Sequence, residues 1–162
     1  GALLAVLARA TRARNILELG TATGYSAIYL GRACESAGGH VLTLEYDPAM
    51  AKRARNNIAR AGLSGTVFVS EANVLEALSE FTGPYDFVFM DIEKKDYRAV
   101  LDMLEPLVQP GGLLLADNTA FKDAHEFNQA IYTAPAWQSV QLFSYLPMHS
   151  ARYDGLCFAV RL

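Results

Sequence analysis

Short apolar runs alternate with longer amphipathic stretches along most of the chain, and this alternation restricts the fold more than any other feature. It is typical of successive βα units, in which parallel strands are covered by helices. The apolar runs predict five strands, at Asn15–Gly20, His40–Tyr46, Thr66–Glu71, Tyr85–Asp91 and Gly112–Asn118. The amphipathic stretches predict four helices between them, at Tyr25–Ser36, Pro48–Ala61, Val74–Phe81 and Tyr97–Val108.

The pattern changes after the fifth strand. A predicted helix over Ala124–Tyr132 is followed by two strand-like runs, Gln138–Tyr145 and Leu156–Leu162. The joint between these runs is short and contains Pro147 and Gly155, so we expect an antiparallel hairpin rather than another crossover. The 162 residues, of which 52% are hydrophobic, suffice for one domain with a sizeable core. We therefore predict a single α/β domain with five parallel strands and a reversed pair.

Composition limits the classes of function. A net charge of −3 does not suggest a nucleic-acid-binding surface, which favours small-molecule chemistry. Cys34 and Cys157 are the two cysteines and lie far apart, so neither a zinc site nor a disulfide framework is predicted. The apolar opening Ala2–Ala8 is far shorter than the roughly 20 residues that span a bilayer, and a cytoplasmic protein is expected. The chain starts inside a helical pattern without an initiator Met, so we expect an upstream segment to be missing.

The segment Asn15–Gly24 runs from an apolar strand directly into a helix, through a turn that carries Gly20 and Gly24. In a doubly wound sheet this first turn lies at the carboxyl edge, where ligands bind, and the helix amino terminus offers free N–H groups to an anion. The spacing G-x-x-x-G differs from the G-x-G-x-x-G of dinucleotide binders. It favours a smaller cofactor with a carboxylate, such as S-adenosylmethionine, although an ordinary βα turn is the alternative.

Glu45 lies near the end of the second predicted strand, 25 positions after Gly20. An acid at this place can accept hydrogen bonds from both hydroxyls of a ribose. The alternative is a solvated carboxylate that caps the helix beginning at Pro48. Together with the glycine turn, Glu45 favours a cofactor that contains adenosine.

Oxygen-bearing side chains end the fourth and fifth predicted strands, at Asp91 and at Asp117 and Asn118. Neighbouring parallel strands would bring these side chains together, and oxygen ligands suit Mg²⁺ or a similar hard cation. Lys94 follows Asp91 by three residues and, beside a cation, could act as a base towards a hydroxyl. The alternative is a solvated charged turn.

Taken in order, these residues resemble the catechol and caffeoyl-CoA O-methyltransferase family, a cation-dependent branch of the class I methyltransferases. The resemblance covers Leu3 to Leu162 and is carried by four motifs, Leu17–Ser26, Leu44–Pro48, Met90–Tyr97 and Ala116–Asn118. It implies a Rossmann-like, mostly parallel seven-stranded sheet of order 3-2-1-4-5-7-6, in one methyltransferase domain over residues 1–162 that lacks the family's N-terminal helical segment. It also implies S-adenosylmethionine and a divalent cation, with Mg²⁺ expected, and a homodimer.

The resemblance also assigns roles to residues. It places Ser26 on the cofactor's carboxylate and Glu45 on the ribose. Glu71 and Ala72 take the place that lines the adenine, although Glu71 departs from the small residue or proline often found there. The full set implied for the cofactor is Glu18, Gly20, Thr21, Gly24, Tyr25, Ser26, Glu45, Tyr46, Glu71, Ala72 and Asp91. The implied metal ligands are Asp91, Asp117 and Asn118, and the implied catalytic residues are Lys94 and Asp91.

The predicted reaction is methyl transfer to a hydroxyl of a small phenolic acceptor, either catechol-like or hydroxycinnamoyl. Phe121, Lys122 and the loop Pro147–Tyr153 are expected near the acceptor, whereas Trp137 and Tyr145 are expected in the core or an interface. One alternative is a methyltransferase acting on hydroxyuridine in transfer RNA, for which arginines would supply a basic surface: Arg9, Arg12, Arg14, Arg53, Arg55 and Arg60. Another is a module that binds S-adenosylmethionine without transferring its methyl group.

Overall fold

The structure is a computed structural model that describes residues 1–145 and 153–162. The described residues form a seven-stranded sheet of order β3-β2-β1-β4-β5-β7-β6, so the predicted order is confirmed. The strands are β1 Asn15–Leu19, β2 His40–Glu45, β3 Val67–Glu71, β4 Tyr85–Met90, β5 Val108–Ala116, β6 Trp137–Tyr145 and β7 Tyr153–Arg161. β1 to β5 pair in parallel, and β7 runs antiparallel to both β5 and β6, as the predicted hairpin requires.

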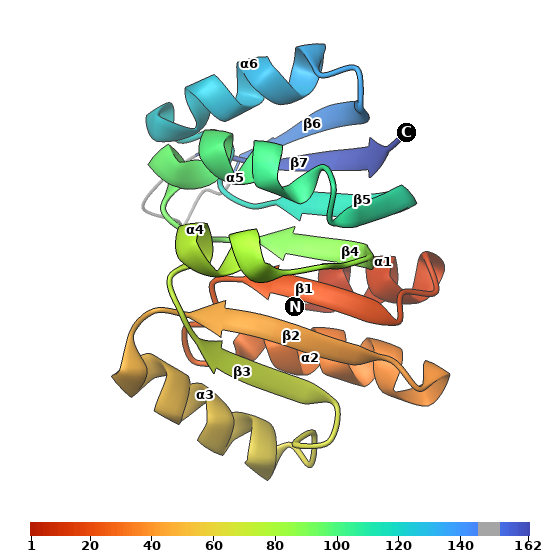
Figure 1. Ribbon diagram of the computed structural model, residues 1–162, viewed down its shortest axis with the longest axis vertical. Helices are drawn as coiled ribbons and strands as arrows, with labels where there is room; N and C mark the ends of the chain where they lie inside the picture. Colours follow the sequence, from red (N-terminus) through yellow and green to blue (C-terminus); the bar gives the residue numbers. More distant parts are fainter. Residues whose placement is uncertain (146–152) are drawn as a thin grey trace.

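Helices cover both faces of the sheet, and Figure 1 shows α4, α5 and α6 in front of it with α1 and α2 behind. Their bounds are α1 Ala2–Ala10, α2 Tyr25–Cys34, α3 Pro48–Arg60, α4 Val74–Ala77, α5 Tyr97–Leu104 and α6 His125–Thr133. Among the described residues, no helix combines the length and the apolar character needed to cross a membrane.

The central strands read as unbroken apolar runs because both of their faces are buried. Successive residues of a strand point to opposite faces, so Phe87 joins the core beneath α1, α2 and α3, while its neighbour Val88 joins the core beneath α4, α5 and α6. The same alternation places Ile16 in the first core and Leu17 in the second. This double coverage leaves the carboxyl ends of the strands as the place where polar side chains can gather.

Several element boundaries differ from those expected. α4 is a single turn, Val74–Ala77, continued by a 3-10 turn over Leu78–Glu80. β5 begins at Val108 rather than Gly112, because Val108 pairs with Tyr85 across a register shift in β4. β7 begins at Tyr153 rather than Leu156, so the hairpin strands are longer than the sequence pattern indicates.

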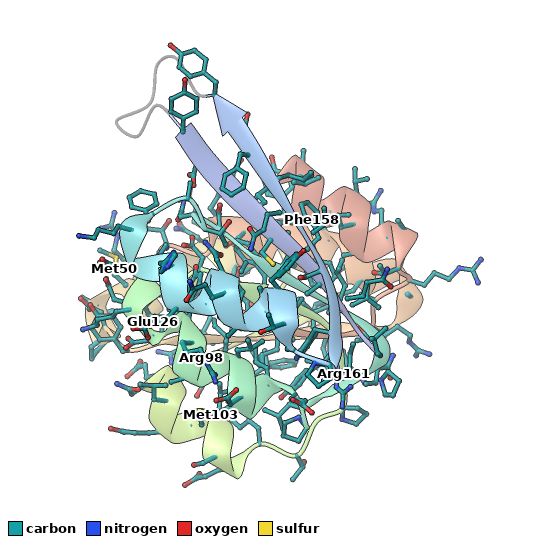
Figure 2. The ribbon with its side chains drawn as sticks, turned by 90° about the horizontal axis from the view of Figure 1, so that it is seen from above. Met50, Arg98, Met103, Glu126, Phe158 and Arg161 are labelled. Carbon is teal, nitrogen blue, oxygen red and sulfur yellow. The ribbon has the colours of Figure 1, made fainter. Side chains whose placement is uncertain are left out.

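The hairpin of β6 and β7 projects beyond the rest of the sheet, with Phe158 on its body and Arg161 near its base (Figure 2). Trp137, at the start of β6, is buried, which confirms its predicted place in the core. Tyr145, at the other end of β6, is exposed instead, and its ring lies 5.3 Å from that of Tyr153.

Candidate functional site

One cavity of about 1270 Å³ opens where the parallel strands end. The turn after β1 and the end of β2 form one part of its wall, and the loops after β3, β4 and β5 form another. Residues of α1 and of the β6–β7 hairpin complete it, including Leu3, Leu142 and Phe143. Most of the predicted cofactor and metal residues thus line one space.

The glycine turn is held between two neighbouring strand ends. The backbone N–H groups of Gly20 and Thr21 both donate to the carbonyl oxygen of Leu44, at 3.1 and 3.2 Å. Gly20 has a φ of +99°, and a Cβ built on it would overlap the carbonyl oxygen of Asp91. Gly24, with a φ of +85°, is the N-cap of α2. Glycine at position 20 therefore lets β1 turn tightly between β2 and β4.

The Glu45 carboxylate ties this turn to the end of β2. It accepts from the N–H of Ala22 at 2.7 Å and from the N–H of Asp47 at 3.0 Å. Glu45 is 7% exposed and lines the cavity. The helix cap that was the alternative role is filled by Asp47, whose side chain accepts from the N–H groups of Ala49 and Met50. Glu45 is therefore free to face a ligand with its remaining lone pairs.

Glu18 is fully buried beneath the turn. Its Oε2 accepts from the Thr43 hydroxyl, which also contacts the Thr21 hydroxyl. Its Oε1 has no hydrogen-bond partner among the described residues. Burial raises the pKa of Glu18 to about 7, although the nearby hydroxyl groups of Ser26 and Thr43 act to lower it. A buried acceptor without a donor is costly, so this atom suits a ligand that brings a donor.

Asp91 and Asp117 lie side by side because the Asp117 N–H donates to the carbonyl oxygen of Met90 at 3.0 Å. Burial raises the pKa of Asp117, and the negative charges of Asp91 and Asp154 raise it further. Asn118 follows with a φ of +54°, and its Nδ2 donates to Asp154. Within residues 1–145 and 153–162 no group of three or more His, Cys, Asp or Glu is placed to hold a metal. The predicted ligand set of two carboxylates and one amide is instead an all-oxygen set that suits a hard cation.

Lys94 does not lie in a solvated turn, since its side chain is 18% exposed. Its Nζ donates to Asp91 Oδ1 at 2.8 Å and to the carbonyl oxygen of Ile92 at 2.9 Å. The same Nζ lies 5.5 Å from the centre of the Tyr97 ring. The structure thus brings Lys94 and Asp91 together on the cavity wall.

Not every predicted residue faces the cavity. The Glu71 carboxylate pairs with the Arg55 guanidinium, and Glu71 does not line the cavity, although Ala72 does. Glu18, Gly24 and Asn118 do not line it either, whereas Tyr25, Ser26 and Tyr46 do. Phe121 and Lys122, expected near the acceptor, do not line it. Of the loop expected there, Pro147 to Arg152 lie outside the described residues, and Tyr153 is exposed.

Tyr97 is a residue that the sequence pattern did not single out. Its hydroxyl lies 3.0 Å from the carbonyl oxygens of both Met90 and Asp117, so it joins the ends of β4 and β5. Burial raises the pKa of Tyr97. No local signal marks this role, because the contact with Asp117 spans 20 positions.

Replacing Tyr97 by phenylalanine is expected to lower the free energy of unfolding by about 1–2 kcal/mol, because a buried hydrogen bond is lost. Urea denaturation followed by circular dichroism measures the change. Tyr132→Phe is the matched control, since Tyr132 is 82% exposed on α6 and should change little. Equal losses in the two variants would contradict the role of the Tyr97 hydroxyl.

The sequence is similar to a methyltransferase family and to curated O-methyltransferases. Residues 17–119 match the family described as "Methyltransferase domain". The chain is 38% identical over 148 residues to a catechol O-methyltransferase of Niastella koreensis, an alignment that covers 89% of this chain and 66% of the relative. The curated relatives that match it are longer, and the chain spans about half to two thirds of their length.

Solved structures show the same fold. An O-methyltransferase from Bacillus cereus in complex with SAH superposes with a TM-score of 0.91 at 32% identity, covering 99% of this chain and 79% of that one. An O-methyltransferase from Streptomyces achromogenes, involved in tomaymycin synthesis and in complex with SAM, superposes with a TM-score of 0.89 at 27% identity. That match covers 98% of this chain and 78% of the other.

Proposed function

The chain belongs to the class I family of S-adenosylmethionine-dependent O-methyltransferases, and on that basis we propose that it methylates a hydroxyl of a small aromatic acceptor with the help of a divalent cation, with Mg²⁺ expected. One observation carries the proposal. A single cavity joins the glycine turn and Glu45 to a second group made of Asp91, Lys94 and Asp117. A methyl donor and an ionisable hydroxyl could therefore meet in one space.

The residues around the turn fit the cofactor. The unpartnered Oε1 of Glu18 suits the ammonium group of the methionyl end, which is a charged donor. Ser26 and the amino terminus of α2 suit the carboxylate of the same end. Glu45 retains lone pairs for the ribose hydroxyls, and Ala72 lines the cavity where the adenine is proposed. Glu71 is left out of this set because its carboxylate is turned to Arg55.

Asp91, Asp117 and Asn118 are the residues proposed to hold the cation. These residues suit a cation because all three supply oxygen donors. Burial and the neighbouring negative charges raise the pKa of Asp117, and a bound positive ion would offset both effects. A bound divalent cation would supply the charge that lowers the pKa of an acceptor hydroxyl. The site could thus produce an oxygen nucleophile near neutral pH.

Lys94, as the free amine, is proposed to take the hydroxyl proton. The acceptor oxygen then forms a bond to the methyl carbon, and the carbon–sulfur bond breaks with its electron pair going to sulfur. The products are the methyl ether and adenosylhomocysteine. Because the sulfonium is already a good leaving group, the work of the chain is to position the two reactants and to exclude water.

The wall near the acids favours a small aromatic acceptor. Leu142 and Phe143 of β6 line it, and Leu156 of β7 does so as well. Apolar side chains next to a few polar groups are typical of small-molecule sites. Asp91, Glu93 and Asp117 also line it, and this negative charge would repel the phosphates of a transfer RNA. The homodimer and the cytoplasmic location remain predictions.

The test is methyl transfer from labelled S-adenosylmethionine to a panel of catechols, hydroxycinnamoyl thioesters and undermethylated transfer RNA. Turnover is expected with a phenolic acceptor in Mg²⁺, and it should be lost in a chelator and in Asp91→Ala. Asp102→Ala is the matched control, because this exposed carboxylate of α5 pairs with Arg98 outside the cavity. Equal activity of Asp91→Ala and wild type would refute the metal mechanism, and activity on transfer RNA alone would refute the acceptor class.

A further inference from the structure

We infer that Asp154 is a positioning residue, which fixes the side-chain amide of Asn118 so that its oxygen is left for the cation. This inference rests on the proposed metal site. Asn118 Nδ2 donates to Asp154 Oδ2 at 2.7 Å, between residues 36 positions apart. Asp154 also lines the cavity, on β7.

The inference follows from the chemistry of the two groups. A side-chain amide has nearly the same shape when it is turned by 180°, which exchanges its oxygen and its NH₂ group. An ionised carboxylate only accepts hydrogen bonds, so Asp154 is satisfied by the NH₂ group and not by the amide oxygen. The opposite orientation would set two oxygens against each other and present the NH₂ group, a donor, to the cation. Asp154 therefore selects the orientation in which Asn118 Oδ1 can serve as a ligand.

Asp154 is itself held in place. Its Oδ1 accepts from the N–H of Gly155 at 2.7 Å, and the carbonyl oxygen of Gly155 accepts from the N–H of Thr119 at 2.9 Å. A Cβ on Gly155 would lie 2.8 Å from the Thr119 hydroxyl oxygen, so only glycine lets β7 come this close to the loop. Both Asp154 oxygens thus accept from N–H donors, and these two hydrogen bonds hold the carboxylate in one orientation towards Asn118.

The loop that carries Asn118 is also fixed by the hairpin. Asn118 has a φ of +54°, a left-handed conformation that asparagine adopts more readily than most non-glycine residues. The next residue, Thr119, is held from the side of the hairpin, since its hydroxyl donates to Gln141 at 2.9 Å. The β6–β7 hairpin therefore sets the geometry of the loop that carries two of the three proposed ligands.

The test measures binding of Mn²⁺ to the full chain by titration calorimetry without an acceptor. Asp154→Ala should bind Mn²⁺ about 10- to 100-fold more weakly, the usual effect of removing a group that orients a ligand. Asp154→Asn keeps one oxygen that can accept from Asn118, so its affinity for Mn²⁺ should lie between those of wild type and Asp154→Ala. Asp123→Ala removes an exposed carboxylate outside the cavity and should bind like wild type. Thermal unfolding and affinity for adenosylhomocysteine should stay near wild type in Asp154→Asn.

A double-mutant cycle separates a support from a direct ligand. If Asp154 acts through Asn118, then Asp154→Ala should have no further effect on Mn²⁺ affinity in an Asn118→Ala background. An equal loss in both backgrounds would overturn the inference, as would an Asp154→Ala variant that binds like wild type. If Asp154→Ala does not fold, the same double-mutant cycle is measured with Asp154→Asn. A wild type without Mn²⁺ affinity would instead overturn the metal part of the proposed function, and this inference with it.

Discussion

Gly20→Ala is expected to leave little folded protein, whereas Gly62→Ala should cost only about 1–2 kcal/mol. Both glycines have a positive φ, +99° at Gly20 and +74° at Gly62, so both replacements carry a backbone penalty. They differ in the space available. A Cβ at Gly62 meets nothing within 4 Å. One at Gly20 overlaps the carbonyl oxygen of Asp91 and lies 2.9 Å from its carbonyl carbon.

The overlap at Gly20 cannot be relieved by a side-chain rotation, because the obstructing atoms belong to the backbone. Moving the Asp91 carbonyl would separate β1 from β4, which are joined there by the Asp91 N–H donating to Leu19 at 2.8 Å. We expect a loss of more than about 4 kcal/mol, a large part of the total stability of a domain of this size. Urea denaturation of the two variants measures the difference, and equal midpoints would show that the turn can relax.

The number and approximate positions of the central strands could be predicted because each strand is marked by a local sequence pattern. Each central strand is a short apolar run bounded by turn residues, and the resemblance added the strand order. The boundaries that differ depend on pairing between distant residues. The Pro110 to Gly112 segment reads as a turn, yet Val108 pairs with Tyr85 and extends β5 through it. No pattern within either segment alone could indicate that pairing.

The residues of the candidate site likewise fall into those marked by local sequence and those that depend on distant contacts. Asp91 and Asp117 could be found because each is an acid directly after a buried strand. Thr43, Tyr97 and Asp154 were missed, since each acts on a residue 20 to 36 positions away. Glu71 illustrates the opposite case. Its place in the chain suggests a role near adenine, but Arg55 on α3 draws its carboxylate away from the cavity.

Glu18→Gln is expected to make the ligand-free protein more stable at pH 8 and to weaken its affinity for adenosylhomocysteine on the order of 100-fold. The stability effect follows from the pKa of Glu18, which burial raises from 4.5 to about 7. The folded state then holds the proton more tightly than the unfolded state. Stability due to this group is therefore full below about pH 4.5, falls as the pH rises to about 7, and is constant above that.

The loss between pH 4.5 and 7 amounts to about 3 kcal/mol for the wild type, and glutamine cannot ionise. The difference in unfolding free energy between pH 5 and pH 8 should therefore be smaller in Glu18→Gln. Glu76→Gln, on the exposed surface of α4, is the control and should follow the wild type. Parallel stability curves for Glu18→Gln and wild type would mean that Glu18 titrates like an exposed acid.

The same proton links Glu18 to the cofactor. An ammonium group is attracted by the ionised carboxylate, so below about pH 7 binding must first remove the proton from Glu18. Wild-type affinity for adenosylhomocysteine should rise with pH between 5.5 and 7, by up to about tenfold per unit, and then level off. Glu18→Gln should bind weakly and with little dependence on pH in this range. Calorimetric titration at several pH values measures both curves. A wild-type affinity that does not change with pH would show that Glu18 does not bind the cofactor ammonium.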